Sequence, residues 1–290
     1  MSVYKRDYRA YNGAVTPLWT RVLVLVRYGL DEVWSSKITI GFCVFSMLPI
    51  VVGLVQIYLA NNPTASAIIF RGGSRLFEIS PTFFFRILSS QCWLALAMAS
   101  WIAPRLITYD LADNALPILL SHPVSRFNYV LGKFLASFVS LSSITWVPCM
   151  ILFVFQIYSA PSAWLAANYS IVWGIMAGTV IWIALLSLLG LALSSWVKWK
   201  IVATGFIFAA VMVPAGVGGI VSAVLRTKWG LLLNVPVMMT KLWQRLLGVP
   251  EFGRDWSLPT SAIVTMLLLV CLLSVAMLNA RIRAREVVRG

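Results

Sequence analysis

Residues 171–196 read IVWGIMAGTVIWIALLSLLGLALSSW and contain no charged side chain. The hydrocarbon core of a bilayer is about 30 Å thick, and a helix needs about 20 apolar residues to cross it. A run this long and this uniformly apolar predicts a membrane-spanning helix, because barrel strands are shorter and alternate apolar with polar residues. The stretch therefore indicates a helical membrane protein.

Five further stretches have the same character, and together they predict an all-α membrane protein with one six-helix transmembrane domain. The six expected spans are residues 38–59, 83–103, 134–156, 171–196, 201–224 and 259–280. None contains an acidic residue, and the basic residue among them is Arg86, which we expect to extend toward the outer headgroups rather than to contact a substrate. With 60% hydrophobic and 11% charged residues, the chain is not an ordinary soluble domain.

The formal net charge of +14 is unevenly distributed between the segments that flank the spans. Lysine and arginine number fifteen in residues 1–37, 104–133, 197–200 and 281–290, against seven in residues 60–82, 157–170 and 225–258. Cytoplasmic loops carry the excess of basic residues, so both termini and the 104–133 connector are expected in the cytoplasm. This distribution explains the charge without nucleic-acid binding and fits a multi-pass membrane protein. The basic tail, residues 281–290, is expected to touch anionic lipid headgroups.

Two segments outside the spans carry helical patterns. Within the N-terminal segment 1–37, apolar residues recur at three- and four-residue steps from Pro17 to Lys37, which predicts an amphipathic helix in the membrane interface. The outer loop 225–258 is too apolar for a solvated loop, so one or two short helices are expected on or in the outer leaflet.

Glycine and proline mark two places within the spans. Gly174 and Gly178 have the G-x-x-x-G spacing that permits close helix approach. The run VPAGVGG, residues 213–219, predicts a broken or flexible helix, either a structural kink or a moving element. The candidate residues for this break are Pro214, Gly216, Gly218 and Gly219.

Reactive groups are scarce, so the chain is not expected to be catalytic or to hold a metal or cofactor by itself. The single histidine is His122, the four cysteines lie in the spans without metal or redox spacing, and the spans lack the acids of proton- or sodium-driven transporters. Gly132-Lys133 is not a phosphate loop, because Phe127 and Phe134 replace its required glycine and hydroxyl residue. Free energy for any pumping would come from a separate ATPase subunit.

The connector includes residues 109–133, YDLADNALPILLSHPVSRFNYVLGK. This segment resembles the cytoplasmic connector in permease subunits of type-2 ATP-binding-cassette (ABC) exporters, through its acidic start, Leu-Ser-x-Pro-x-Ser-Arg at 120–126 and Gly132-Lys133. His122 and Ala112 stand where that family often has basic residues. The resemblance implies a coupling helix seated in a groove of an ABC ATPase subunit, with ATP and magnesium bound there, and a second permease, either a homodimer copy or a paralogue. The implied coupling residues are Asp110, Asp113, Leu116, Ser121 and Arg126. A permease on a separate chain is typical of bacteria, so the resemblance also implies a bacterial inner membrane.

The residues themselves suit that interpretation. Leu111, Ala115, Ile118 and Leu119 share one face of a helix, while Asp110 and Asp113 share a side on which they can meet basic groups of a partner. The alternative is an interfacial helix capped by Asp110, with Arg126 and Lys133 only touching headgroups.

Three functional classes follow from these observations. The first is the permease subunit of an ABC exporter. The second is a non-transporting membrane anchor or assembly factor that recruits a cytoplasmic partner through the connector. An intramembrane enzyme is the third, and it is disfavoured for want of reactive groups.

Overall fold

The computed structural model describes residues 17–69, 78–112, 125–250 and 257–287, and the described residues form helices and short connections. The elements before the connector are α1 (Leu18–Trp34), α2 (Lys37–Ser46), α3 (Leu48–Asn61), α4 (Pro63–Ile69) and α5 (Pro81–Ala112). Those after it are α7 (Arg126–Ser142), α8 (Trp146–Ser159), α9 (Ser162–Asn168), α10 (Ser170–Trp196), α11 (Lys200–Val224), the 3₁₀ helix η1 (Lys228–Leu233), α12 (Val235–Leu246) and α13 (Thr260–Val287).

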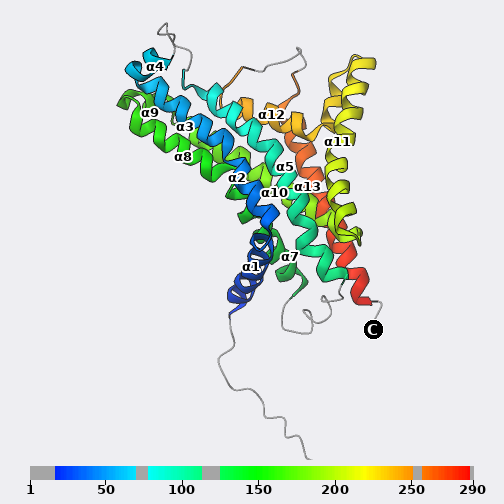
Figure 1. The fold of residues 1–290 in the computed structure, drawn as a ribbon. Helices are drawn as coiled ribbons and strands as arrows, with labels where there is room; N and C mark the ends of the chain where they lie inside the picture. The colour runs from blue at the N-terminus through cyan, green and yellow to red at the C-terminus, as the bar shows by residue number, and fades with distance from the viewer. Residues whose placement is uncertain (1–16, 70–77, 113–124, 251–256, 288–290) are drawn as a thin grey trace, which may run out of the picture.

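Six helical stretches of the described chain are long and apolar enough to cross a membrane, so the predicted all-α membrane fold is confirmed. They are Lys37–Asn61, Pro81–Thr108, Arg126–Ser159, Ser170–Trp196, Lys200–Val224 and Thr260–Ile282. Helices α5 and α10 pack against each other at the centre, and the other spans surround them. We call the end that carries α1 and the C-terminus of α13 the connector end, and the end that carries α4, α9 and α12 the α12 end (Figure 1).

The first span is divided into α2 and α3 by a turn at Met47. Pro49 causes the division, because it has no N–H to donate and its ring clashes with the carbonyl four residues earlier. The side-chain amide of Gln91 in α5 donates to the Ser46 carbonyl at 2.9 Å, so this backbone oxygen has a partner where water is absent.

A similar division separates α7 from α8 in the third span. Pro148 lies in the first turn of α8, and the preceding residues 143–145 form a turn. Thr145 Oγ1 donates to the Leu141 carbonyl at 2.8 Å, which supplies a partner next to the break. Proline within a span is tolerated where side chains take up the freed backbone groups in this way.

The helices of the second and third spans extend into the predicted connector from both sides. Helix α5 continues through Pro104 to Ala112, and α7 begins at Arg126. Ser125 caps α7, since its side-chain oxygen accepts from the Asn128 N–H at 3.2 Å. Between these two helices, residues 113–124 of the expected connector lie outside the described residues.

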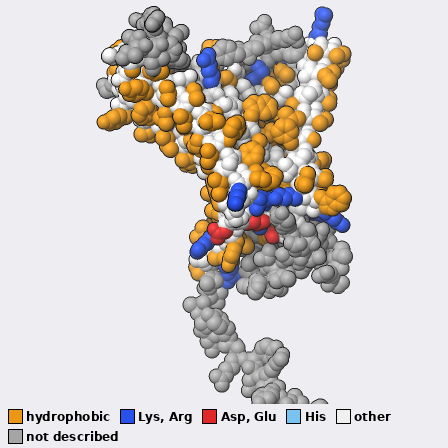
Figure 2. Space-filling model, in the orientation of Figure 1, with side chains coloured by type: hydrophobic (Ala, Val, Ile, Leu, Met, Phe, Trp, Pro, Cys, Tyr) orange, Lys and Arg blue, Asp and Glu red, His pale blue; other side chains and the backbone are white. Residues whose placement is uncertain are grey.

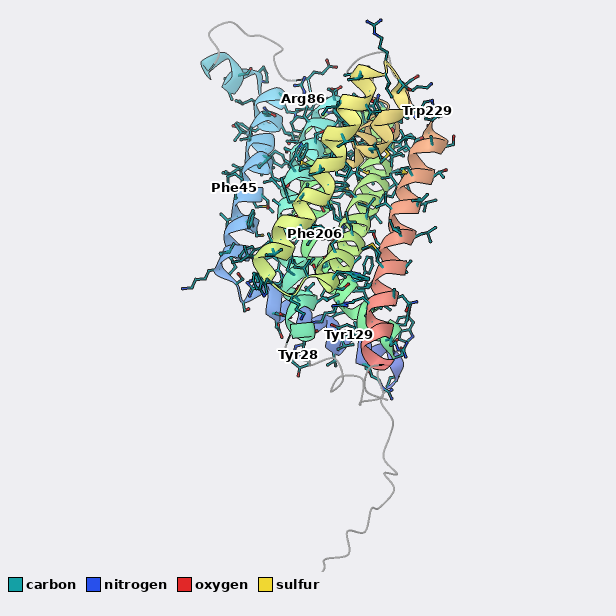
Figure 3. The ribbon with its side chains drawn as sticks, turned by 90° about the vertical axis from the view of Figure 1, so that its right-hand side faces the viewer. Tyr28, Phe45, Arg86, Tyr129, Phe206 and Trp229 are labelled. Carbon is teal, nitrogen blue, oxygen red and sulfur yellow. The ribbon has the colours of Figure 1, made fainter. Side chains whose placement is uncertain are left out.

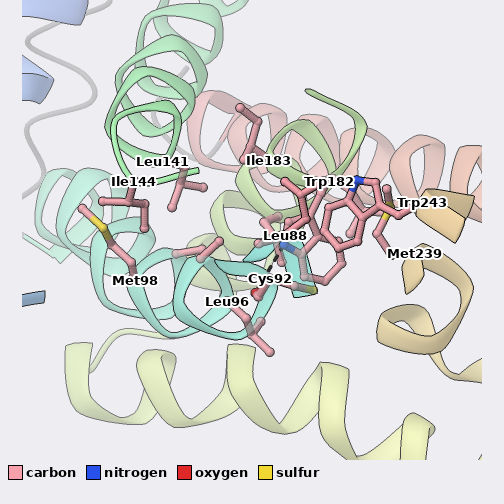
Figure 4. Packing of buried hydrophobic residues seen from close by; sticks show 14 of the residues in the cluster. Leu88, Cys92, Leu96, Met98, Leu141, Ile144, Trp182, Ile183, Met239 and Trp243 are labelled. Atoms are coloured by element: carbon pink, nitrogen blue, oxygen red, sulfur yellow. Dashed lines mark hydrogen bonds between the residues drawn. The ribbon is translucent and has the colours of Figure 1, made fainter. Parts of the chain in front are cut away.

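Helices η1 and α12 confirm that the described part of the 225–258 segment carries short helices, and α12 packs against the protein core. Met238, Met239 and Trp243 of α12 are buried. Trp243 lies edge-on to Trp182 of α10, with ring centroids 6.5 Å apart (Figure 4). Trp182 in turn donates from Nε1 to the Cys92 carbonyl of α5 at 3.3 Å, which links three elements.

The Gly174 and Gly178 pair does permit close approach, and its partner is α12. A Cβ atom on Gly174 would lie 2.6 Å from Leu247 Cδ2, and one on Gly178 would overlap the indole of Trp243. Both contacts are shorter than carbon atoms tolerate, so a side chain at either position would displace Leu247 or the indole of Trp243.

Helix α11 runs from Lys200 to Val224 without interruption, so residues 213–219 do not break it. Gly218 serves packing, because a Cβ atom there would overlap the Gly230 carbonyl oxygen of η1. No neighbouring atom lies within 4 Å of the Cβ positions of Gly216 and Gly219. Whether Pro214 and these two glycines allow movement stays a prediction.

The contact between Gly178 and Trp243 predicts a selective loss of stability. Gly178→Ala forces the indole away from α10 and is expected to lower the free energy of unfolding by about 1–3 kcal/mol. Thermal unfolding in detergent, followed by tryptophan fluorescence, measures the effect. Gly205→Ala in α11 is the matched control, because its Cβ meets no atom within 4 Å. Equal melting temperatures for the two variants would contradict the packing described above.

Candidate coupling site at the connector end

Helix α1 lies tightly against α7 through two glycines. A Cβ atom on Gly29 of α1 would lie 2.7 Å from the Cβ of Ala136, and one on Gly132 of α7 would lie 2.7 Å from the Cβ of Leu25. Small residues on both helices therefore let the two backbones approach closely. The predicted interfacial helix is confirmed as a helix, and its Gly29 face is packed against a transmembrane helix.

Four side chains from α1, α5 and α7 form what we call the charge cluster: Glu32, Asp110, Tyr129 and Lys133. The Lys133 ammonium lies 2.9 Å from Asp110 Oδ2 and 3.6 Å from Glu32 Oε2. Tyr129 donates its hydroxyl to Asp110 Oδ2 at 2.8 Å. Figure 2 shows the acidic side chains of this face among basic ones at the connector end, below the apolar surface of the spans.

Burial makes this cluster important for the stability of the connector end. The Lys133 side chain is 9% exposed and that of Asp110 18%. An ammonium shielded from water to this extent requires a carboxylate partner, since the desolvation cost of an unpaired charge is several kcal/mol. Lys133 on α7 therefore keeps α5 and α1 in place through their acids, and separating these helices exposes all three charges.

Glu32 has the less favourable position of the two acids. Burial raises the pKa of the Glu32 carboxyl above its ordinary value of 4.5, and the Lys133 ammonium opposes this increase. Because the folded-state pKa is raised, the protonated form contributes stability that is full below pH 4.5 and is lost as the pH rises through the raised pKa. Asp110 also lies closer to the Lys133 ammonium than Glu32 does, at 2.9 Å against 3.6 Å, so it is the closer ionic partner.

The C-terminal end of α10 is tied to its neighbours at the same level. Thr108 of α5 donates to the Ser194 carbonyl at 3.2 Å, and Arg281 of α13 donates from Nε to the Ser195 carbonyl at 3.1 Å. The Arg281 guanidinium also lies 5.3 Å from the centre of the Trp196 ring. These groups satisfy carbonyls that a helix end leaves without partners, and a cation there matches the helix dipole.

The predicted site residues fall into three groups. Asp110 is part of the charge cluster and directs its carboxylate toward α7 of its own chain. Arg126 is the first residue of α7 and lines a shallow cavity of about 390 Å³ with Phe127 and residues of α13. Asp113, Leu116 and Ser121 lie outside the described residues.

Two basic residues for which headgroup contacts were considered have protein partners: Lys133, in the alternative interpretation of the connector, and Arg281 of the basic tail. Lys133 does not reach the lipid surface, because it pairs with Asp110 and Glu32 inside the bundle. Arg281 of the basic tail binds the end of α10. Sequence reasoning missed Glu32 and Tyr129 as members of the site. The acidic charge of Glu32 on the amphipathic helix α1 was an available signal, but nothing in the local sequence indicates which residues contact Lys133.

The arrangement is suited to transmit movement. Residues 113–124 are flanked by α5 and α7, and side chains join these helices to α1, α10 and α13 at one level of the bundle. A force on the connector therefore acts on several spans together.

A double-mutant cycle on Asp110 and Lys133 tests the cluster. Asp110→Leu and Lys133→Met each leave a buried charge with a poorer partner, so each is expected to lower the free energy of unfolding by roughly 2–4 kcal/mol. The double variant removes both charges and should lose clearly less than the sum of the two. Thermal unfolding in detergent reports these values, with Lys37→Met on the exposed surface as a control that changes little. Additive losses would show that the two side chains do not interact.

A scan against models of known protein families matches none of them, and a search of curated protein sequences finds no match.

Proposed function

We propose that this chain is the permease subunit of an ABC exporter, working with separate cytoplasmic ATPase subunits and a second permease. In this proposal ATP and magnesium are bound by the ATPase, and this chain is not catalytic by itself. The connector end faces the cytoplasm of a bacterial cell, and the 113–124 segment seats in a groove of the ATPase.

The observation that carries the proposal is the location of the charge cluster beside the connector. Asp110 lies three residues before the 113–124 segment, and Arg126 and Lys133 follow it, so both flanks are fixed to each other through the Asp110–Lys133 pair. A segment held at both ends transfers a push to the helices that carry it. A simple tether to a cytoplasmic partner has no need of such a fixed base.

The unequal burial of the spans also supports an assembly with a second permease. In the most apolar part of the first, fifth and sixth spans, 22% of the residues are buried, against 50–61% in the corresponding part of the other three. The second, third and fourth spans thus form the interior, while the outer three have surface available for lipid and for another subunit. ATP-driven closure of the ATPases would tilt the interior spans through the connector and alternate the access of a cavity between the two permeases.

The proposal predicts an ATPase activity that depends on the connector. The tagged chain, purified from its native membrane, is expected to bring with it vanadate-sensitive ATP hydrolysis. Leu116→Arg places a charge in the apolar contact and should lower the co-purified activity by at least about tenfold, since one hot-spot residue contributes that much.

Leu225→Arg is the matched control, because Leu225 is exposed and follows α11 at the α12 end. This variant should keep the full activity, and both variants should keep the melting temperature of the unmodified protein. Undiminished activity in Leu116→Arg would contradict the proposal. A partner that hydrolyses ATP equally well without this chain would instead favour the alternative function, a non-transporting membrane anchor.

A further inference from the structure

A groove of about 760 Å³ opens on the side of the bundle between the first span and α5. One wall is formed by α2 and α3, and the other by the first half of α5 and the residues that precede it. The lining residues used below are Phe45, Val52, Gln56, Glu78, Arg86 and Leu94. Figure 3 shows Arg86 near the α12 end and Phe45 deeper in the membrane-spanning region.

The groove is polar at one end and apolar along the rest of its length. Gln56, Glu78 and Arg86 line it toward the α12 end, together with the hydroxyl-bearing residues Ser80 and Thr82. Deeper in the bundle, the walls are aliphatic and aromatic and extend to Leu94 of α5. Arg86 and Leu94 are eight residues apart in one helix, which corresponds to about 12 Å along its axis. This length covers most of the hydrocarbon region of one leaflet, which is about 15 Å thick.

Two side chains of opposite charge line the polar end of the groove, and neither is paired with another described residue. Arg86 and Glu78 are both exposed and line the same groove. Neither side chain forms a hydrogen bond or ion pair within the part of the chain that the structure describes. Two charges of opposite sign next to an apolar groove are complementary to a ligand that carries both signs on its head and hydrocarbon on its tail.

We propose that this groove binds a phospholipid whose headgroup carries both a phosphate and a primary ammonium, as phosphatidylethanolamine does. The guanidinium of Arg86 holds the phosphate, for which its planar set of donors is suited. The Glu78 carboxylate accepts hydrogen bonds from the ammonium, and one acyl chain lies between Val52 and Leu94. Because the site depends only on groove residues, the proposal is independent of the exporter function.

An arginine that merely reaches the headgroup layer would also contact phosphate, but it would not distinguish lipids. The groove adds that distinction, since Glu78 favours an ammonium and disfavours an anionic headgroup. A purely anionic lipid, such as phosphatidylglycerol, should therefore bind less tightly than phosphatidylethanolamine.

Native mass spectrometry of the delipidated full chain tests the site. Short-chain phosphatidylethanolamine and phosphatidylglycerol are titrated separately, and the bound lipids are counted at each concentration. Arg86→Gln should weaken the binding of both lipids by about tenfold, because it removes one charge-assisted hydrogen bond. Glu78→Gln should weaken the binding of phosphatidylethanolamine alone, so that the protein no longer prefers it to phosphatidylglycerol. Val52→Trp, which fills the apolar part, should weaken both while the melting temperature is retained.

Arg226→Gln is the matched control, because Arg226 is an exposed arginine at the same end of the bundle, outside the groove. It should bind both lipids as the unmodified chain does. Equal binding by Arg86→Gln and Arg226→Gln would overturn the site. An unchanged lipid preference in Glu78→Gln would overturn the assignment of the ammonium.

Discussion

Lys133, whose side chain is 9% exposed and whose ammonium is shared between Asp110 and Glu32, determines how the connector end is built. Apolar side chains give little preference between protein and lipid in a bilayer, so a span cannot be located by hydrophobic burial alone. A buried charge, in contrast, fixes position strongly, because its removal from a partner costs several kcal/mol. The pairing of α7 with α5 and α1 therefore has one well-defined arrangement at the end where the connector begins and finishes.

The same requirement for partners explains the irregular parts of the spans. Pro49 divides the first span, and Gln91 supplies a donor for the Ser46 carbonyl at the division. At the end of α10, Thr108 and Arg281 supply donors for the carbonyls of Ser194 and Ser195. Each of these donors comes from a different helix than the carbonyl it binds. The places where a helix stops or bends are thus also the places where neighbouring helices are joined.

Hydropathy was sufficient to predict the six spans, because the bilayer selects directly for length and apolarity. The ends of α5 and α7 were harder to predict, since Asp110 and Lys133 are typical of a solvated loop when each is read separately. Their pairing links positions 23 residues apart and depends on how the helices are arranged. The spacing of Gly174 and Gly178 correctly indicated a close approach, but the partner was α12, an element expected in the leaflet. Local sequence indicates that a residue needs a contact, and the tertiary fold decides with which residue.

Distances between spin labels measure the proposed movement of the spans, in which ATP hydrolysis by a partner acts through the connector end. Labels replace Trp19 of α1, Phe127 of α7 and Ile201 of α11, all exposed at the connector end, in a variant without its four native cysteines. Pulsed electron paramagnetic resonance compares the nucleotide-free complex with the vanadate-trapped one. We expect an unchanged distance from α1 to α7, because the glycine contacts and the charge cluster join them, and a change of several ångströms from α7 to α11. Identical distances for both pairs in the two states, with ATP hydrolysis intact, would contradict it.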